Sequence, residues 1–349
     1  MTETLPDVTP TMAPQPDGVA WPTDGWPEGV APPSVGALVD RAFEDPELAE
    51  TYAVAVVQGG RLIAERYGGA LPSFTHEPTP VAVATPLLGW SMSKSVLHAA
   101  VGLLVDDGRL DVDAPAAVPE WSDRSDPRGR ITLRHLLEMR DGLAWVEDYV
   151  DDTVSDVIEM LFGSGCSDVA AFAACRELAA APGTTFNYSS GTSNLVARVV
   201  GDVVGRGEAT RAFLDERLFG PLGMHDATVT LDATGTFIGS SYVYCSAQSW
   251  ARFATLYLRG GQWDGRRVLS SSWVDSAQVP VSRDVDERTY YSMHWWLDGE
   301  GAYWASGYEG QRCVVSPRRD AVVVRLGRTP AARYPALRTW CDAVLAALG

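Results

Sequence analysis

Strand-like segments lie at the two ends of this 349-residue chain, and a long helical stretch separates them. β-Branched and aromatic residues are concentrated at both ends, and Gly59-Gly60 predicts a two-residue hairpin turn in the first group. The expected strands are residues 52–58, 61–67, 302–306, 312–316 and 321–326. They predict an antiparallel sheet in which the two ends of the chain meet.

The middle of the chain has the periodicity of helices joined by long loops. Residues 92–107 are apolar nearly all round and end at Gly108, which predicts a buried central helix. The other expected helices are residues 34–43, 132–139, 156–162, 168–179, 192–204, 210–218, 247–258 and 334–348.

These segments predict an α/β (α+β) fold, in which an antiparallel five-stranded sheet is flanked by helices and an all-α region is inserted. Residues 1–33 are expected to form an extended N-terminal segment. Residues 34–89 plus 260–349 form a discontinuous α/β domain, and residues 90–259 a mainly helical domain. We expect the site in a cleft at the boundary between the two domains.

Charge and composition exclude several classes of partner. The chain has 45 acidic and 28 basic residues and a net charge of −17, so it repels nucleic acid and anionic membrane surfaces. The start of the chain resembles neither a signal peptide nor a membrane anchor, which predicts a cytoplasmic protein. The five cysteines and five histidines show no ligand-type spacing, so we expect no metal and no cofactor.

Lys94 is the only lysine among the 28 basic residues. Arginine stays protonated, whereas a buried lysine can lose its proton, which suggests that this position needs a deprotonatable amine. Ser91 lies three residues earlier at the start of the central helix, so the two side chains share one face. A neutral Lys94 could activate the Ser91 hydroxyl, and the Ser91 backbone N–H could bind an oxyanion.

Two further patterns could carry chemistry. Tyr188 lies on a loop before a helix and could act as a general acid or base if a cation such as Lys94 lowers its pKa; packing on the core is the alternative. Residues 305–311 (ASGYEGQ) contain small residues that let a substrate approach a strand, and the N–H of Tyr308 could be a second oxyanion donor. A strand followed by a glycine bulge explains the same pattern.

The order of these motifs resembles the serine β-lactamase and penicillin-binding-protein superfamily over residues 34–348. Residues 141–149 (DGLAWVEDY), the Pro182-Gly183-x-x-Phe-x-Tyr-Ser motif and Gly307-x-x-Gly310-Gln311 are similar to the class C β-lactamase-related branch. Within that branch the chain looks most like 6-aminohexanoate-dimer (nylon-oligomer) hydrolases and related carboxylesterases. The resemblance therefore implies a β-lactamase-like fold and acyl-enzyme chemistry.

The resemblance also assigns the catalytic roles. It implies that Ser91 is the acylated nucleophile, Lys94 its base and Tyr188 the proton shuttle to the leaving group. Ser190 stands where the superfamily has Asn or Ser and would help to hold Lys94. Tyr308, which follows Gly307, would supply the second oxyanion N–H.

The substrate-binding residues are less specific. The resemblance matches Tyr149 to a loop tyrosine that closes over substrate in nylon-oligomer hydrolases. The candidates for substrate binding are Tyr149, Trp145, Trp90, Trp296, Ser306 and Glu309, with Trp295, Trp304 and Tyr308 as further aromatic walls. The third motif usually begins with Lys or His, whereas Ala305 stands here, so a cation for a β-lactam carboxylate is missing.

We therefore expect a serine hydrolase that acts on small linear amides or carboxylic esters. The alternatives are a β-lactamase or D-aminopeptidase-type enzyme of the same fold, or a non-catalytic penicillin-binding-like module. An α/β-hydrolase is a weaker reading, because residues 89–93 (GWSMS) lack the second glycine of the G-x-S-x-G motif. The expected partner is a small-molecule amide or ester substrate, and the chain could form a homodimer.

Overall fold

An eight-stranded antiparallel sheet joins the two ends of the chain in the computed structural model, which describes residues 5–72, 77–149, 155–284 and 289–349. The strand order is β10-β11-β12-β13-β14-β15-β1-β2. The five long strands are β1 (Glu50–Gln58), β2 (Arg61–Tyr67), β13 (Tyr303–Gly307), β14 (Gln311–Ser316) and β15 (Ala321–Arg328). The expected strands are confirmed, and β15 pairs with β1 to bring the two ends of the chain together.

Three short strands extend the sheet beyond the five that were expected. They are β10 (Ser282–Asp284), β11 (Thr289–Tyr291) and β12 (Trp296–Leu297). Segments of two or three residues are too short to show an alternating pattern, so nothing local distinguishes them from loop. Pairing with their neighbours in the sheet defines them, and β12 pairs with β13 in the register that places Trp296 opposite Trp304.

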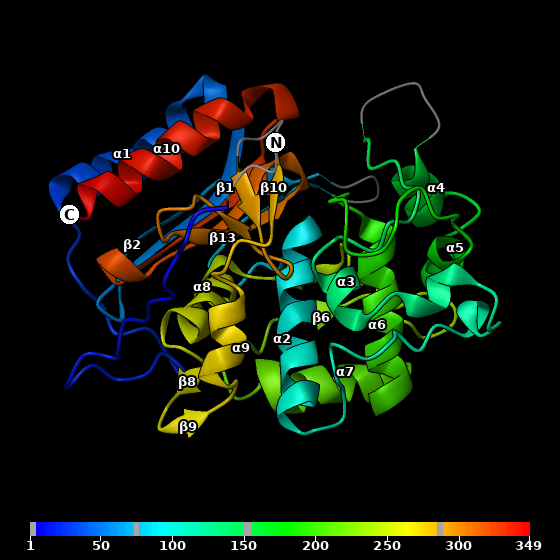
Figure 1. Cartoon of the computed structure of the whole chain (residues 1–349). Coiled ribbons are helices and arrows are strands. Elements are labelled where there is room, and N and C mark those ends of the chain that lie inside the picture. Colours follow the sequence, from blue (N-terminus) through cyan, green and yellow to red (C-terminus); the bar gives the residue numbers. More distant parts are fainter. Residues whose placement is uncertain (1–4, 73–76, 150–154, 285–288) are drawn as a thin grey trace.

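Helices cover both faces of this sheet. Helices α1 (Pro33–Glu44) and α10 (Tyr334–Ala347) lie side by side on one face, and α8 (Ala247–Leu258) packs on the other (Figure 1). Successive side chains of β1 point to opposite faces of the sheet, so this strand packs against the helices on both sides. Val54 and Val56 face the first layer, whereas Ala55 and Val57 belong to the larger core beneath α8.

The helical region contains every element that was expected there. Its helices are α2 (Ser93–Asp106), α3 (Leu133–Leu137), α4 (Asp156–Phe162), α5 (Val169–Ala174), α6 (Ser190–Val204) and α7 (Glu208–Leu214). Helix α9 (Ser271–Ser276) was not expected. Helix α5 ends five residues early, because Ala179 and Ala180 donate backbone hydrogen bonds to the Gly142 carbonyl instead of continuing the helix.

Short strands complete the structure. They are β3 (Ala70–Leu71), β4 (Thr79–Pro80), β5 (Leu87–Leu88), β6 (Thr228–Val229), β7 (Val243–Cys245), β8 (Gln262–Trp263) and β9 (Arg266–Arg267). The segment before α1 runs over α8, where the backbone N–H of Ala13 donates to Leu258 and the side chain of Arg252 to Pro22. It wraps the surface in irregular form.

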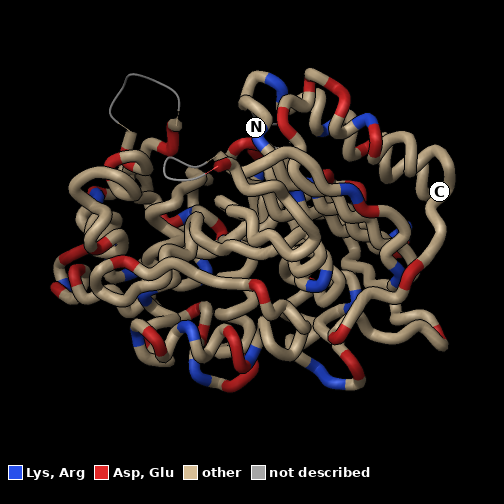
Figure 2. The backbone as a smooth tube through the Cα atoms, turned by 180° about the vertical axis from the view of Figure 1, so that it is seen from behind, with Lys and Arg blue, Asp and Glu red and all other residues tan. Residues whose placement is uncertain are grey.

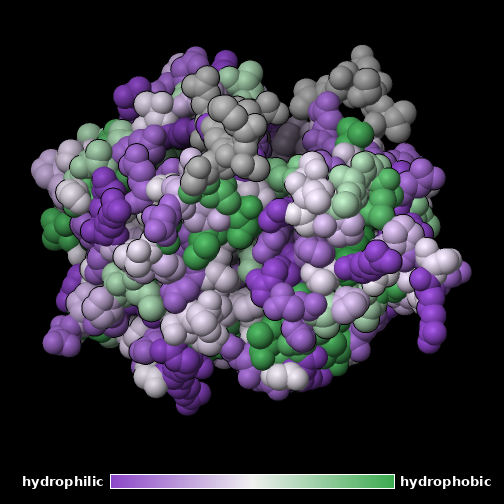
Figure 3. All heavy atoms as spheres, in the orientation of Figure 1, coloured by the Kyte–Doolittle hydropathy of each residue, from purple (hydrophilic) through white to green (hydrophobic). Residues whose placement is uncertain are grey.

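Charged residues lie mostly on the outer loops and helices. Both signs of charge alternate along the outer loops and helices, whereas long uncharged stretches run through the interior (Figure 2). On the face in Figure 3, hydrophobic residues form small groups among hydrophilic ones. Within the described part of the chain, no helix combines the length and the hydropathy that crossing a bilayer requires.

Candidate active site

Ser91 sits in a single 3₁₀ turn, Trp90–Met92, directly before α2. The turn is anchored at Gly89, whose N–H donates to the Val243 carbonyl and whose Cα is packed against Trp250 so closely that a Cβ would lie 2.4 Å from the indole. Trp90 has a φ of +47°, a left-handed conformation that is costly for a bulky side chain. A strained, well-anchored turn therefore presents the Ser91 hydroxyl.

Lys94 lies on the first turn of α2 and is 2% exposed. Its Nζ is 2.9 Å from Ser91 Oγ, 3.1 Å from Ser190 Oγ and 3.0 Å from the carbonyl oxygen of Ser240. Burial lowers the pKa of Lys94 to about 8, and the carboxylate of Glu147 opposes part of that shift. About a tenth of the amine is therefore neutral at pH 7, far more than for an exposed lysine.

The partners of Lys94 determine where its lone pair points once it is neutral. The Ser240 carbonyl can only accept, and the Ser190 hydroxyl donates its proton to Glu147 Oε1 at 2.5 Å, so it too accepts from the lysine. These two bonds use the two N–H groups of a neutral amine. The lone pair is left facing Ser91 Oγ, which is the geometry that a general base requires.

Glu147 is a residue of this site to which the sequence analysis assigned no role. Its carboxylate accepts the backbone N–H of Ser190 at 2.8 Å as well as the hydroxyl, and it accepts the indole N–H of Trp145 at 2.6 Å. It thus orients Ser190 and places a negative charge near Lys94. The available signal was its position in the DGLAWVEDY motif, two residues before Tyr149.

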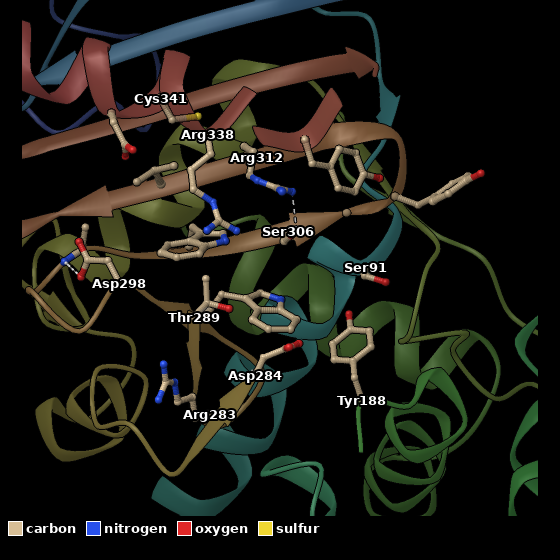
Figure 4. A pocket seen from close by; sticks show the side chains of 18 of the residues that line it. Ser91, Tyr188, Arg283, Asp284, Thr289, Asp298, Ser306, Arg312, Arg338 and Cys341 are labelled. Carbon is tan, nitrogen blue, oxygen red and sulfur yellow. Dashed lines mark hydrogen bonds between the residues drawn. The ribbon is translucent and has the colours of Figure 1, made fainter. Parts of the chain in front are cut away.

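Tyr188 lies on the loop that ends at Ser189, the N-cap of α6, and its hydroxyl points toward Ser91 (Figure 4). Lys94 Nζ lies 4.8 Å from the centroid of the Tyr188 ring. Burial raises the pKa of Tyr188, and Glu147 adds to this rise. The net shift of this pKa is upward, because burial outweighs the lowering by the Ser91 hydrogen bond and by Arg312. Tyr188 is a neutral phenol that can donate a proton.

The end of β13 closes the other side of the nucleophile. A Cβ on Gly307 would lie 2.2 Å from the carbonyl oxygen of Gly89, so only glycine lets the strand approach the turn that carries Ser91. Tyr308 follows directly, and its ring packs 5.5 Å from that of Trp90 and stacks on Tyr149 at 4.5 Å. The backbone of this segment is thereby held beside Ser91.

A cavity of about 830 Å³ opens from Ser91. Of the sequence candidates, its lining includes Ser91, Tyr149, Tyr188, Trp296, Trp304, Ser306, Gly307 and Tyr308. Tyr149 is the last described residue before the 150–154 gap. Its ring also faces that of Trp90 at 6.4 Å.

Four of the candidates for substrate binding lie outside this lining. Trp145 packs behind α6 against Gly191, and Trp295 is fully buried in the core. The Trp90 ring is packed against other aromatic rings beside the cavity. Glu309 pairs with Arg328 at 3.1 Å instead of facing substrate. Aromatic residue type alone does not distinguish a cavity wall from core packing, which is why the sequence could not separate them.

No group of three or more His, Cys, Asp or Glu side chains is arranged to hold a metal ion among residues 5–72, 77–149, 155–284 and 289–349.

Comparison with known proteins agrees with this geometry. A family model described as Beta-lactamase matches residues 39–340. A 6-aminohexanoate-dimer hydrolase of Paenarthrobacter ureafaciens is 32% identical over 315 residues, which cover 83% of this chain and 75% of that protein.

Solved structures share the fold at lower identity. A candidate 6-aminohexanoate-dimer hydrolase from Bacillus anthracis aligns with a TM-score of 0.77 at 20% identity, covering 97% of this chain and 91% of that one. A family VIII carboxylesterase aligns with a TM-score of 0.70 at 15% identity, covering 91% and 99%. Since the family model matches most of the chain and the Paenarthrobacter relative is similar across 83% of it, this protein belongs to the β-lactamase family.

Proposed function

We propose that this enzyme is a serine hydrolase that forms an acyl-enzyme on Ser91 and hydrolyses small linear amides or carboxylic esters. The observation that carries the proposal is the contact between Lys94 Nζ and Ser91 Oγ at 2.9 Å, with the other two partners of the amine acting as acceptors. A buried lysine with a pKa of about 8 is suited to take a serine proton.

The proposed reaction begins when neutral Lys94 removes the proton of Ser91 and Oγ attacks the substrate carbonyl carbon. The backbone N–H groups of Ser91 and Tyr308 bind the oxygen of the tetrahedral intermediate. Tyr188 donates its proton to the leaving nitrogen or oxygen and is reprotonated by the lysine. Water then attacks the ester carbon of the acyl-enzyme and releases the acid.

Linear amides are the first substrates to test. The Paenarthrobacter relative is named for the dimer of 6-aminohexanoate, and a structural neighbour is a carboxylesterase. The aromatic side chains of Tyr149, Trp296 and Trp304 line a cavity that suits an apolar chain between polar groups. The proposed location is the cytoplasm. The proposed assembly is a homodimer, which light scattering would test.

The decisive experiment labels the protein with a fluorophosphonate and reads the adduct by intact-mass and peptide mass spectrometry. We expect one adduct, on Ser91, and its loss in Ser91→Ala. Ser95→Ala is the matched control, since Ser95 lies four residues later on the first turn of α2 and donates to the His294 carbonyl. An adduct on another serine would refute the assignment, and no adduct at all would favour the non-catalytic penicillin-binding-like module.

Nitrophenyl esters, linear amide dimers and a chromogenic β-lactam then separate the remaining alternatives. We expect hydrolysis of esters and amides. Turnover of the β-lactam faster than of every ester and amide would favour the β-lactamase reading instead.

A further inference from the structure

A tight turn, Tyr308–Gly310, joins β13 to β14 at the edge of the cavity. Gly307 at the end of β13 pairs with Gln311 at the start of β14. Two successive residues of the turn have left-handed backbone conformations, with a φ of +59° at Glu309 and +81° at Gly310. Glycine adopts such a φ freely, but the Cβ of Glu309 crowds the neighbouring backbone. The turn that carries the proposed oxyanion donor, the N–H of Tyr308, is therefore strained.

Each of the three carbonyl groups of this turn accepts a hydrogen bond from a buried residue. The donors come from the start of β14, from β15 and from the residue that follows β15. They are Gln311 Nε2 to Tyr308 at 3.0 Å, the Thr329 N–H to Glu309 at 2.8 Å and Arg325 Nη1 to Gly310 at 3.2 Å. Hydrogen bonds in the interior are costly to leave unmade, so these donors hold the turn in its strained conformation.

The side-chain amide of Gln311 is held in place by a second segment. Its Nε2 donates to the Gly327 carbonyl at 2.6 Å, and its Oε1 accepts the Gly327 N–H at 3.0 Å. These two bonds set the plane of the amide and use one of its two N–H groups, which leaves the other for the carbonyl of Tyr308. Gln311 is 3% exposed, so it can influence a substrate only through this turn.

Arg325 ties the other end of the turn to the sheet. Its buried guanidinium donates to the carbonyls of Leu48 and Glu50, each at 2.9 Å. It also donates to the Thr51 hydroxyl at 3.1 Å, in addition to the Gly310 carbonyl. Arginine offers five N–H donors in one rigid plane, so a single side chain can hold carbonyls of different segments at once. The turn is thus fixed to the segment that leads into β1.

The bond from Gln311 restrains a peptide whose rotation would relieve the strain. Reversing the peptide plane between Tyr308 and Glu309 would bring the φ of Glu309 into the usual negative range. The same rotation would carry the Tyr308 carbonyl oxygen away from Gln311 Nε2. Because the proposed oxyanion donor is the N–H of Tyr308 itself, relaxation of the turn would also shift this donor.

We propose that Gln311 is a positioning residue for the oxyanion site, because its bond to the Tyr308 carbonyl keeps the Tyr308 N–H directed at the oxygen that becomes charged. The inference rests on the proposed function and adds a residue that acts through the turn. An oxyanion donor is effective when it is fixed in advance at the position of the charged oxygen. Formation and hydrolysis of the acyl-enzyme both pass through a tetrahedral oxyanion, so kcat depends on this donor whichever step is slow.

Gln311→Met removes the hydrogen bonds of this side chain and keeps its length. We expect kcat for 4-nitrophenyl butyrate to fall about 10- to 100-fold with little change in KM, as a misplaced oxyanion donor predicts. The inhibitor 1,1,1-trifluoro-2-pentanone accepts Ser91 Oγ at its carbonyl carbon and forms a tetrahedral oxyanion, so it should bind more weakly by a similar factor. A loss of folded protein would lower kcat but leave the inhibition constant of this ketone unchanged.

Gln58→Met is the matched control. Gln58 Nε2 also donates to two backbone carbonyls, those of Arg319 at 3.1 Å and Leu348 at 3.0 Å. Gln58 lies opposite Ala321, at the other end of the β1–β15 pair from Gly327. We expect its kcat and its ketone affinity to match the wild type. Melting curves of both variants check that the fold is retained.

Hydrogen exchange separates failure of this inference from failure of the proposed function. Mass spectrometry of peptides that contain Tyr308 and Glu309 should show faster amide exchange in Gln311→Met than in the wild type or Gln58→Met. Faster exchange would support the hold of Gln311 on the turn even if no ester is hydrolysed. Unchanged exchange, or an unchanged kcat with unchanged ketone affinity, would overturn the positioning role. Absence of a fluorophosphonate adduct on Ser91 would count against the proposed function instead.

Discussion

Replacing Glu147 with glutamine removes one negative charge beside the proposed base and keeps the side chain nearly isosteric. Glu147 and Lys94 both bind the Ser190 hydroxyl, so their charged groups lie roughly 5 Å apart, and at an effective dielectric of about 20 two unit charges interact there with about 3 kcal/mol. Water at the half-buried carboxylate screens part of this energy. We therefore expect Glu147→Gln to lower the pKa of Lys94 by about one unit, equivalent to roughly 1.4 kcal/mol.

The sign of the effect follows from the role of the amine. The lysine must be neutral to accept the Ser91 proton, so wild-type kcat/KM should rise with pH through a pKa of about 8. In Glu147→Gln this acidic limb should move to lower pH, because the protonated amine has lost a stabilising partner. The neutral ester 4-nitrophenyl butyrate is suitable for the profile, since it does not titrate itself.

A control and a clear contrary result make this profile informative. Glu216→Gln removes the same charge from an exposed position after α7 and should leave the acidic limb in place. A Glu147→Gln profile in which the acidic limb stays at the wild-type pH and only the maximal kcat/KM falls would refute the electrostatic argument. Glu147 would then act solely by orienting Ser190.

The remaining predictions concern the base and the proton donor. Lys94→Arg preserves the positive charge but cannot accept a proton, so kcat should fall about 10²- to 10⁴-fold, nearly as far as in Lys94→Ala. If steady-state kinetics show that Lys94→Arg keeps most of the wild-type kcat, Lys94 is not the base. Tyr188→Phe should depress amide hydrolysis far more than nitrophenyl-ester hydrolysis, because only the amide nitrogen needs a proton to leave. Equal losses on both substrates at an unchanged melting temperature would contradict the shuttle role.

Local sequence was sufficient to predict that Ser91 and Lys94 meet at the centre of the candidate site. Ser91 and Lys94 are three residues apart at the start of a helix, and helical geometry alone brings such side chains together. The long strands and helices could also be predicted from the sequence, because each has a run of apolar residues with the period of its structure. Composition marks the same position, since Lys94 is the single lysine of the chain.

Tertiary structure decided what surrounds that centre. Ser190 and Ser240 reach Lys94 from 96 and 146 residues away, and Glu147 joins them from a third segment. Burial raises the pKa of Tyr188, and a sequence cannot show how deeply a side chain on a loop is buried.

Strand register decided the charge in the cavity. The sequence by itself determined the S-x-x-K pair and the absence of a cation at Ala305, because both are properties of neighbouring residues. It could not determine that Arg312 faces the cavity beside Ser306, since one step in the register of β14 would turn that side chain to the other face of the sheet. Periodicity places residues on elements, but only packing of distant elements sets which of their side chains meet.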